Sequence, residues 1–324
     1  MTIRSSTFLI VAAGALCHLL DAQTSPAADA PVVITVEVQN STLYRGDTFD
    51  SSKIAKDPGP TTSVNTAFIT VFNVGDIRTV NGETVKGIWS SPAQALPFHA
   101  NPQPGQPIAD VDSTGMLQCI WQILTSDGKY IGTLIDNGAA APGPHHIVTG
   151  GDGAFLGMTG VHGAMQFATP ERAASISEDP ANRRTLAGGT GRTTFYLFPR
   201  SRPNVIATPG GPAVTHADGK LVSAASPVAA GEVLTLYATG LGPTTPFVEI
   251  GQAFPQGLAY PVNAPVDIKI NGQSSEVLYA GGYAGSVDGY QVNFRVPAGI
   301  PVGTGSLQLT AAWIPGAPVT IATK

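Results

Sequence analysis

Glycine recurs at short intervals in the segment His146-Ile147-Val148-Thr149-Gly150-Gly151-Asp152-Gly153-Ala154-Phe155-Leu156-Gly157-Met158-Thr159-Gly160-Val161-His162-Gly163. Glycine permits positive φ angles and close approach of neighbouring backbones, which tight turns and the curved strands of small barrels require. We therefore predict structural roles for Gly150, Gly151, Gly153, Gly157 and Gly160. A phosphate-binding loop is excluded, because no Lys-Ser/Thr pair follows and residues 161–168 alternate like a strand.

Two flanking segments extend this pattern. Upstream, residues 119–124 and 127–131 read as a hairpin around Asp127-Gly128, and downstream Gly188-Gly189-Thr190-Gly191 leads into a strand over 193–198. Together with residues 150–160, these segments resemble the barrel superfamily of dirigent proteins and allene oxide cyclases, with Asp152 in place of the usual threonine. The resemblance covers residues 32–200 and implies an antiparallel eight-stranded barrel. The matched positions are architectural, so they imply a fold and no catalytic activity.

Residues 213–324 contain a second series of strand patterns. Residues 231–243 alternate apolar and polar side chains and then break, and similar strands are predicted at 266–270, 276–280, 289–296 and 306–313. Turn signals such as Asn271-Gly272 separate them. The segments 230–243 and 289–299 resemble the Ig-like C-terminal domain of secreted bacterial proteins, which is related to the IPT/TIG group. That resemblance implies a β-sandwich with a spacer, display or adhesion role.

The N-terminus predicts export. Arg4 precedes an apolar run from Phe8 to Leu20 that is too short to span a bilayer, and Ala22 offers a small residue for cleavage. We predict a signal peptide over 1–22, a barrel domain over 31–202, a Pro- and Gly-rich linker over 203–213 and a sandwich over 214–324. The mature chain is expected to be extracellular or on the cell surface, with no membrane segment. Cys119 is then its sole cysteine, read as a buried, inert thiol.

Composition supports an all-β protein and excludes several functions. Only 12% of residues are charged, and there are 38 glycines and 27 prolines. A net charge of −5 provides no basic surface for nucleic acid. There is no G-x-S-x-G elbow and no defined pair of carboxylates, and no cofactor is predicted.

Long loops over 90–107 and 169–185, the second with a helical turn over 171–176, are expected to frame the barrel mouth.

Metal binding receives little support from the sequence alone. His145-His146 could begin a metal site, but adjacent strand residues point to opposite faces, and Asp152 is the nearest potential partner. We therefore predict no metal site and read the two histidines as part of a solvated turn. Alternation leaves open whether His162 and Gln166 face the barrel interior or the solvent.

Two functions remain. The favoured one is a non-enzymatic secreted module for extracellular binding, adhesion or matrix assembly, whose partner is an extracellular or cell-surface component; self-association through the barrel stays open. The alternative follows from the superfamily resemblance: the barrel cavity binds a small hydrophobic or phenolic molecule and steers its cyclisation or coupling. Trp121, His162 and Tyr196 are then the expected contacts, because they offer rigid aromatic surface and orienting polar groups. A barrel plugged by large side chains would favour the first function, and an open apolar pocket the second.

Overall fold

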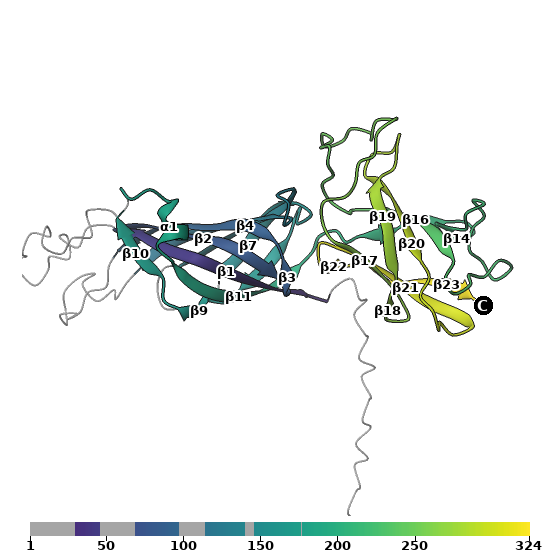
Figure 1. Cartoon of the computed structure of the whole chain (residues 1–324), viewed down its shortest axis with the longest axis horizontal. Coiled ribbons are helices and arrows are strands. Elements are labelled where there is room, and N and C mark those ends of the chain that lie inside the picture. The colour runs from purple at the N-terminus through teal and green to yellow at the C-terminus, as the bar shows by residue number, and fades with distance from the viewer. Residues whose placement is uncertain (1–29, 46–68, 97–113, 140–145, 176) are drawn as a thin grey trace, which may run out of the picture.

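A computed structural model describes residues 30–45, 69–96, 114–139, 146–175 and 177–324 (Figure 1). The predicted signal peptide lies outside these residues, as does the 97–107 part of the first predicted loop. The described residues contain 23 strands and one short helix, α1 (Asn182–Thr185). The all-β prediction is confirmed.

Eight strands of the first half close into an antiparallel barrel. Strand β1 (Val32–Arg45) pairs with β11 (Gly189–Phe198) on one side and with β2 (Ile69–Val80) on the other, and this second pairing closes the ring. From β11 round to β2 the neighbours are β8 (Thr159–His162), β7 (His146–Gly153), β6 (Tyr130–Ala139), β5 (Thr114–Leu124) and β4 (Lys86–Leu96). Short strands β3 (Glu83–Thr84), β9 (Gln166–Thr169) and β10 (Arg172–Ser175) extend the sheet.

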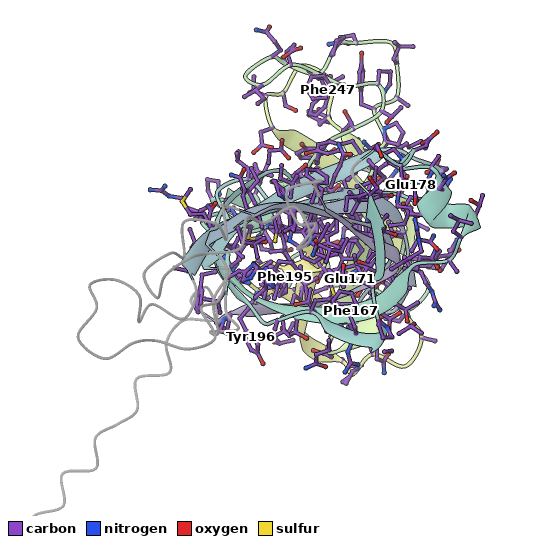
Figure 2. The ribbon with its side chains drawn as sticks, turned by 90° about the vertical axis from the view of Figure 1, so that its left-hand side faces the viewer. Phe167, Glu171, Glu178, Phe195, Tyr196 and Phe247 are labelled. Atoms are coloured by element: carbon purple, nitrogen blue, oxygen red, sulfur yellow. The ribbon has the colours of Figure 1, made fainter. Side chains whose placement is uncertain are left out.

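Buried and more exposed side chains alternate along the barrel strands, and the buried set fills the interior. Every second residue of β1 from Val32 to Val38 is buried, and β11 alternates in the same way. The largest fully buried side chains include Trp121, Phe155 and Phe195. Viewed along the barrel, Phe195 lies within the ring of strands and Tyr196 lies at its rim (Figure 2). The interior of the described barrel is therefore a packed core.

Two loop predictions need correction. Residues 172–175, predicted as part of a helical turn, form β10, which runs parallel to β1 from Thr42↔Arg172 to Arg45↔Ser175. The helix α1 comes later in the chain. Residues 90–96, predicted as loop, continue β4, and Pro92 lies where the β4–β5 pairing skips from Ser90 to Ala93. Proline lacks an N–H group, so it is tolerated where no ladder bond is needed.

The glycine-rich hairpin joins β7 to β8 and shows why most of its glycines are required. Gly153, Gly157 and Gly160 have φ angles of +58°, +72° and +151°, which side chains disfavour. At Gly151 a Cβ would lie 2.6 Å from the Phe155 carbonyl oxygen. A Cβ on Gly150 would meet no described atom within 4 Å, so nothing in the structure explains a glycine there.

The C-terminal half contains two five-stranded antiparallel sheets around a shared core. The first holds β12 (Asn204–Val205), β15 (Val214–Thr215), β16 (Val233–Thr239), β19 (Glu276–Gly282) and β20 (Gly289–Arg295). The second holds β17 (Val266–Ile270), β18 (Gln273–Ser274), β21 (Gly303–Ala311), β22 (Ile314–Pro315) and β23 (Val319–Thr323). Strands β13 (Ala207–Thr208) and β14 (Gly211–Pro212) form a separate pair. Residues 203–213, predicted as a linker, thus carry three strands, and β12 pairs with β16.

The two halves touch where β3 of the barrel lies beside β17 and β22 (Figure 1). Ala312 and Ile314 join the apolar core cluster of the barrel. The Trp313 indole donates to Glu83 Oε2 over 3.0 Å, and the Asn263 side-chain amide donates to the Tyr130 carbonyl oxygen over 2.8 Å. Each half nevertheless keeps its own sheets, since in the described residues no sheet combines strands from both.

Candidate functional site

A cluster of polar side chains interrupts the apolar interior of the barrel. The cluster consists of two pairs of directly opposed residues on four adjacent strands. Cys119 of β5 faces Asp136 of β6, and His146 of β7 faces His162 of β8. Cross-strand partners project to the same face of a sheet, so all four side chains point inward. One ligand atom from each lies within 4.8 Å of all the others.

Asp136 is the centre of this cluster. Its carboxylate is fully buried, with Oδ1 2.9 Å from His146 Nδ1 and Oδ2 3.1 Å from His162 Nε2. The Trp121 indole N–H donates to Oδ2 over 2.7 Å. Burial opposes ionisation of Asp136, but the hydrogen bond from His146 and the approach of His162 and Trp121 outweigh it and lower the pKa. The barrel core therefore holds an ionised carboxylate.

His162 faces the same carboxylate with its second ring nitrogen, Nε2. Its Nδ1 lies 2.7 Å from the Gly163 carbonyl oxygen. A carbonyl oxygen can only accept, so Nδ1 carries a hydrogen and Nε2 is the ring nitrogen directed into the cluster. Nε2 is buried and has no hydrogen-bond partner among the described residues, although Asp136 Oδ2 is close by. The cluster therefore contains one buried ring nitrogen that makes no hydrogen bond to any described residue.

Cys119 contributes a buried thiol. Its Sγ lies 3.6 Å from His146 Nδ1. Burial, and then the negative charge of Asp136, raise the pKa of the thiol to about 12, so it is protonated at neutral pH. The Ser91 hydroxyl and the Trp89 indole act in the opposite direction and favour the thiolate. Both are buried donors that find no partner in the part of the chain described.

The geometry does not fit a Cys-His-Asp catalytic relay. In such a relay the nucleophile and the carboxylate bind opposite nitrogens of the histidine. Here Cys119 Sγ and Asp136 Oδ1 both approach Nδ1 of His146. Because the donor atoms converge on a common point, the cluster resembles a ligand set more than a proton relay.

A second histidine cluster, in the C-terminal half, also fails as a catalytic site. His216 Nε2 lies 3.1 Å from Ser226 Oγ, and its Nδ1 pairs with Glu232. Nε2 is also 3.0 Å from the Ser226 carbonyl oxygen, a group that only accepts. The hydrogen bond to Glu232 raises the pKa of His216, with partial burial acting against it. Both ring nitrogens of His216 thus face groups that accept hydrogen bonds, so neither is free to take a proton from the Ser226 hydroxyl.

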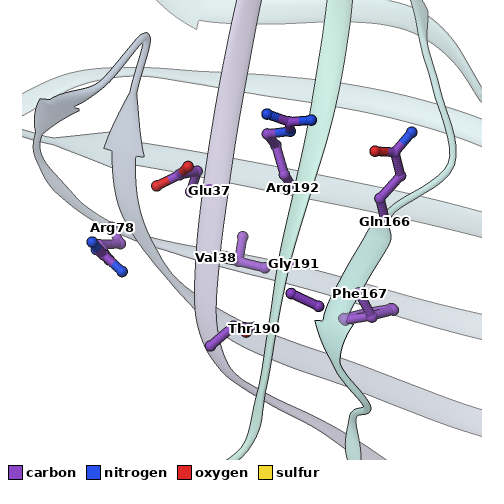
Figure 3. Close-up of a pocket in the computed structure, with 9 residues that line it drawn as sticks. Glu37, Val38, Arg78, Gln166, Phe167, Thr190, Gly191 and Arg192 are labelled. Atoms are coloured by element: carbon purple, nitrogen blue, oxygen red, sulfur yellow. The ribbon is translucent and has the colours of Figure 1, made fainter.

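The three residues predicted to contact a ligand separate into two locations. Trp121 and His162 lie together inside the barrel, with ring centroids 5.6 Å apart. Tyr196 follows the inward-facing Phe195 and is therefore half exposed on the outer wall. Gln166 lies outside too, in a surface groove with Glu37, Arg78 and Arg192 (Figure 3). The strand ends at His162 and a new one begins at Gln166, so the alternation that linked these two residues is broken.

The reading of His146 as part of a solvated turn is wrong. His146 is the first residue of β7, and its side chain is only 13% exposed. The strand pairing with β8 turns it inward onto His162. His145 lies outside the described residues. Sequence reasoning also missed Asp136, and it did not place Cys119 beside any histidine.

Comparison with known proteins adds little. No protein-family model matches the chain, and no curated protein matches its sequence. Among solved structures it is similar to the crystal structure of the N-terminal domain of the Streptococcus gordonii adhesin Sgo0707, with 11% identity and a TM-score of 0.17 over 93% of this chain and 94% of that chain. A TM-score of this size supports no functional argument. Within the described residues, no helix has the length and apolar character needed to cross a bilayer.

Proposed function

We propose that this chain is a secreted, non-enzymatic binding or adhesion module, built from a dirigent-like barrel and an Ig-like sandwich. The observation that carries the proposal is the packing of the barrel interior. Trp121 stacks on Trp89 at 5.4 Å and meets Phe195 edge-on at 5.2 Å. A site for a drug-sized or phenolic molecule needs a cavity of about 300 Å³ or more, and here aromatic rings occupy that position. The alternative, a cavity that steers cyclisation, therefore has less support.

Binding through the outer wall of the barrel fits the same proposal. Val33, Tyr196, Val161 and Ile147 are consecutive cross-strand partners on β1, β11, β8 and β7. Their exposed fractions are 49%, 49%, 38% and 62%. We call these four residues the outer row. Contiguous exposed apolar and aromatic side chains favour a protein partner, because such residues form the centres of protein interfaces.

The first experiment tests the interior. Small phenolics and oxidised fatty acids are titrated into the full chain, and tryptophan fluorescence reports on Trp121. We expect no saturable change. Trp121→Phe and His162→Ala serve as controls, with circular dichroism to check their folding. Saturable binding to the intact chain that folded His162→Ala loses would overturn the proposal in favour of the cavity function, and Trp121→Phe shows whether the signal comes from Trp121.

The second experiment tests the outer row. The full chain is passed over a panel of immobilised extracellular proteins, and each binder is measured again with the double variant Ile147→Ser/Tyr196→Ser. We expect at least a tenfold loss of affinity, about 1.4 kcal/mol. Leu258→Ser is the matched control, since Leu258 is an exposed apolar residue of the C-terminal half. Equal affinities for the double variant and the control would rule out the outer row as the contact surface.

A further inference from the structure

We propose that the barrel interior binds one divalent ion of the zinc class through Cys119 Sγ, an Asp136 carboxylate oxygen, His146 Nδ1 and His162 Nε2. Thiolate, imidazole and carboxylate are the side-chain groups that zinc sites use. The proposal concerns the inner wall of the barrel. It is independent of the outer row and of any partner bound there.

The spacing of the ligand atoms is close to what a tetrahedral ion requires. Bonds of about 2.0–2.3 Å in tetrahedral geometry separate the ligand atoms by about 3.3–3.8 Å. The structure has 3.6 Å from Cys119 Sγ to His146 Nδ1, 2.9 Å from His146 Nδ1 to Asp136 Oδ1, and 3.1 Å from His162 Nε2 to Oδ2 of the same carboxylate. All four ligand atoms lie within 4.8 Å of one another. Ligation therefore needs the contacts between the histidines and the carboxylate to widen by a few tenths of an ångström, and one oxygen of Asp136 to turn toward both histidines.

Surrounding groups already orient two of the ligands. The Gly163 carbonyl oxygen holds a hydrogen of His162 on Nδ1, and so leaves Nε2, which faces the cluster, as the nitrogen that can bind an ion. Metal-binding histidines commonly donate their second N–H to a carbonyl or carboxylate in this way. The unpartnered Ser91 and Trp89 donors beside Cys119 would be satisfied by a thiolate. Without an ion, three buried polar groups around the cluster lack hydrogen bonds, which is costly.

The charges of the four proposed ligands favour a divalent ion. One thiolate and one carboxylate balance two positive charges, so the loaded site is neutral, as a buried site should be. Loading releases one proton, from the Cys119 thiol, and the ring hydrogen of His146 moves from Nδ1 to Nε2 to free the ligating lone pair. The protein supplies all four ligands and the cluster is almost closed to solvent, which is typical of zinc sites that hold an ion without catalysis.

Gly138 makes room for one of the ligands. A Cβ at this position would lie 2.6 Å from Cδ2 of the His146 imidazole. Such a distance is too short for any real contact, so a larger residue would displace the ring. The neighbouring strand β6 therefore supplies Asp136 as one ligand and the space for another.

The test uses the full chain, freed of metal by a chelator and kept reduced. Co²⁺ is added first, because a cobalt–thiolate bond produces a charge-transfer absorption that reports Cys119 directly. We expect the band to saturate at one equivalent, Zn²⁺ to displace it, and Zn²⁺ to raise the melting temperature. No absorption change and no thermal shift in the intact chain would overturn the proposal.

Variants then identify the ligands. Cys119→Ser keeps the size and polarity of the side chain and is expected to abolish the band and weaken Zn²⁺ binding by about 100-fold or more. Gly138→Ala keeps all four ligands but displaces His146, and is expected to weaken binding as well. His216→Gln is the matched control, because it removes a histidine outside the cluster, and it should leave the band unchanged. A band of undiminished strength in folded Cys119→Ser would overturn the assignment.

Discussion

Asp136 shows how one buried charge is held in an apolar core. A carboxylate moved out of water loses solvation worth several kcal/mol unless hydrogen bonds and positive partners replace it. Asp136 gains the Trp121 indole N–H and the His146 ring, and it lies beside His162. Because the carboxylate is fully buried, each of these contacts carries more weight than it would at the surface.

The two stacked tryptophans allow the hydrogen bond to Asp136 to be measured. In Trp121→Phe the indole donor is lost and the carboxylate keeps its burial, so we expect the free energy of unfolding to fall by about 1–3 kcal/mol more than in Trp89→Phe. Trp89 is the matched control, because it is buried and stacked on Trp121 but its N–H has no partner among the described residues. Urea unfolding of both variants gives the comparison. Equal losses would show that the hydrogen bond contributes no net stability.

Adjacent glycines in β7 provide a second matched pair. A methyl group at residue 151 would collide with the carbonyl oxygens of Phe155 and Thr133, at 2.6 and 2.7 Å, whereas at residue 150 it would meet open space. We expect Gly151→Ala to destabilise the barrel by about 1–3 kcal/mol and Gly150→Ala to change its stability by less than about 0.5 kcal/mol. Thermal melts of the two variants measure this difference in stability. Similar melting temperatures would mean that the backbone at 151 relaxes without cost.

At the scale of elements, part of the candidate site could be predicted from the sequence. The Asp127-Gly128 turn predicts a hairpin that sets the strand of Cys119 beside the strand of Asp136. A register shift between Ile123 and Leu124 then decides that these two residues face each other, and the sequence does not reveal that shift. The pairing of His146 with His162 was harder to see, since Gly150 to Gly160 allow several registers. The pairing of β10 with β1 was out of reach, because residues 172–175 find their partners at 42–45, far away in the chain. Local patterns cannot report such contacts.

The helix α1 is attached to the barrel by one carboxylate. Asp76 of β2 accepts hydrogen bonds from Arg183 and Arg184 of α1. Burial opposes ionisation of Asp76, but these bonds and one from Asn40 lower its pKa from 3.8 to about 2. A lowered pKa gives stability that is complete above 3.8 and is lost as the pH falls through about 2. Protonation should therefore release α1 in that window.

The corresponding variant is Asp76→Asn. We expect it to lose on the order of 2 kcal/mol of stability at pH 7, and to show a flatter dependence on pH between about 4 and 2 than the unchanged chain. Denaturant unfolding across that pH range is the measurement. Arg184→Gln should give a smaller effect, because Arg184 is more than half exposed and solvent screens its charge. If the variant and the unchanged chain gave parallel pH profiles, Asp76 would not be the group that titrates.

On the scale of the whole molecule, the two halves should separate by a single cut. The barrel sheet ends at Phe198 and the next strand begins at Asn204. Trypsin can cleave after the exposed Arg200, whereas Arg202 is protected by the proline that follows it. Each half retains complete sheets and its own core, so we expect two fragments that elute separately and keep their β circular dichroism. Across the boundary, Trp313 and Asn263 make hydrogen bonds, and Ala264, Ala312 and Ile314 pack into the apolar cluster of the barrel. We expect so small a contact not to hold the fragments together at micromolar concentration. Co-elution of the fragments, or unfolding of either one after cleavage, would show that the halves form a single cooperative unit.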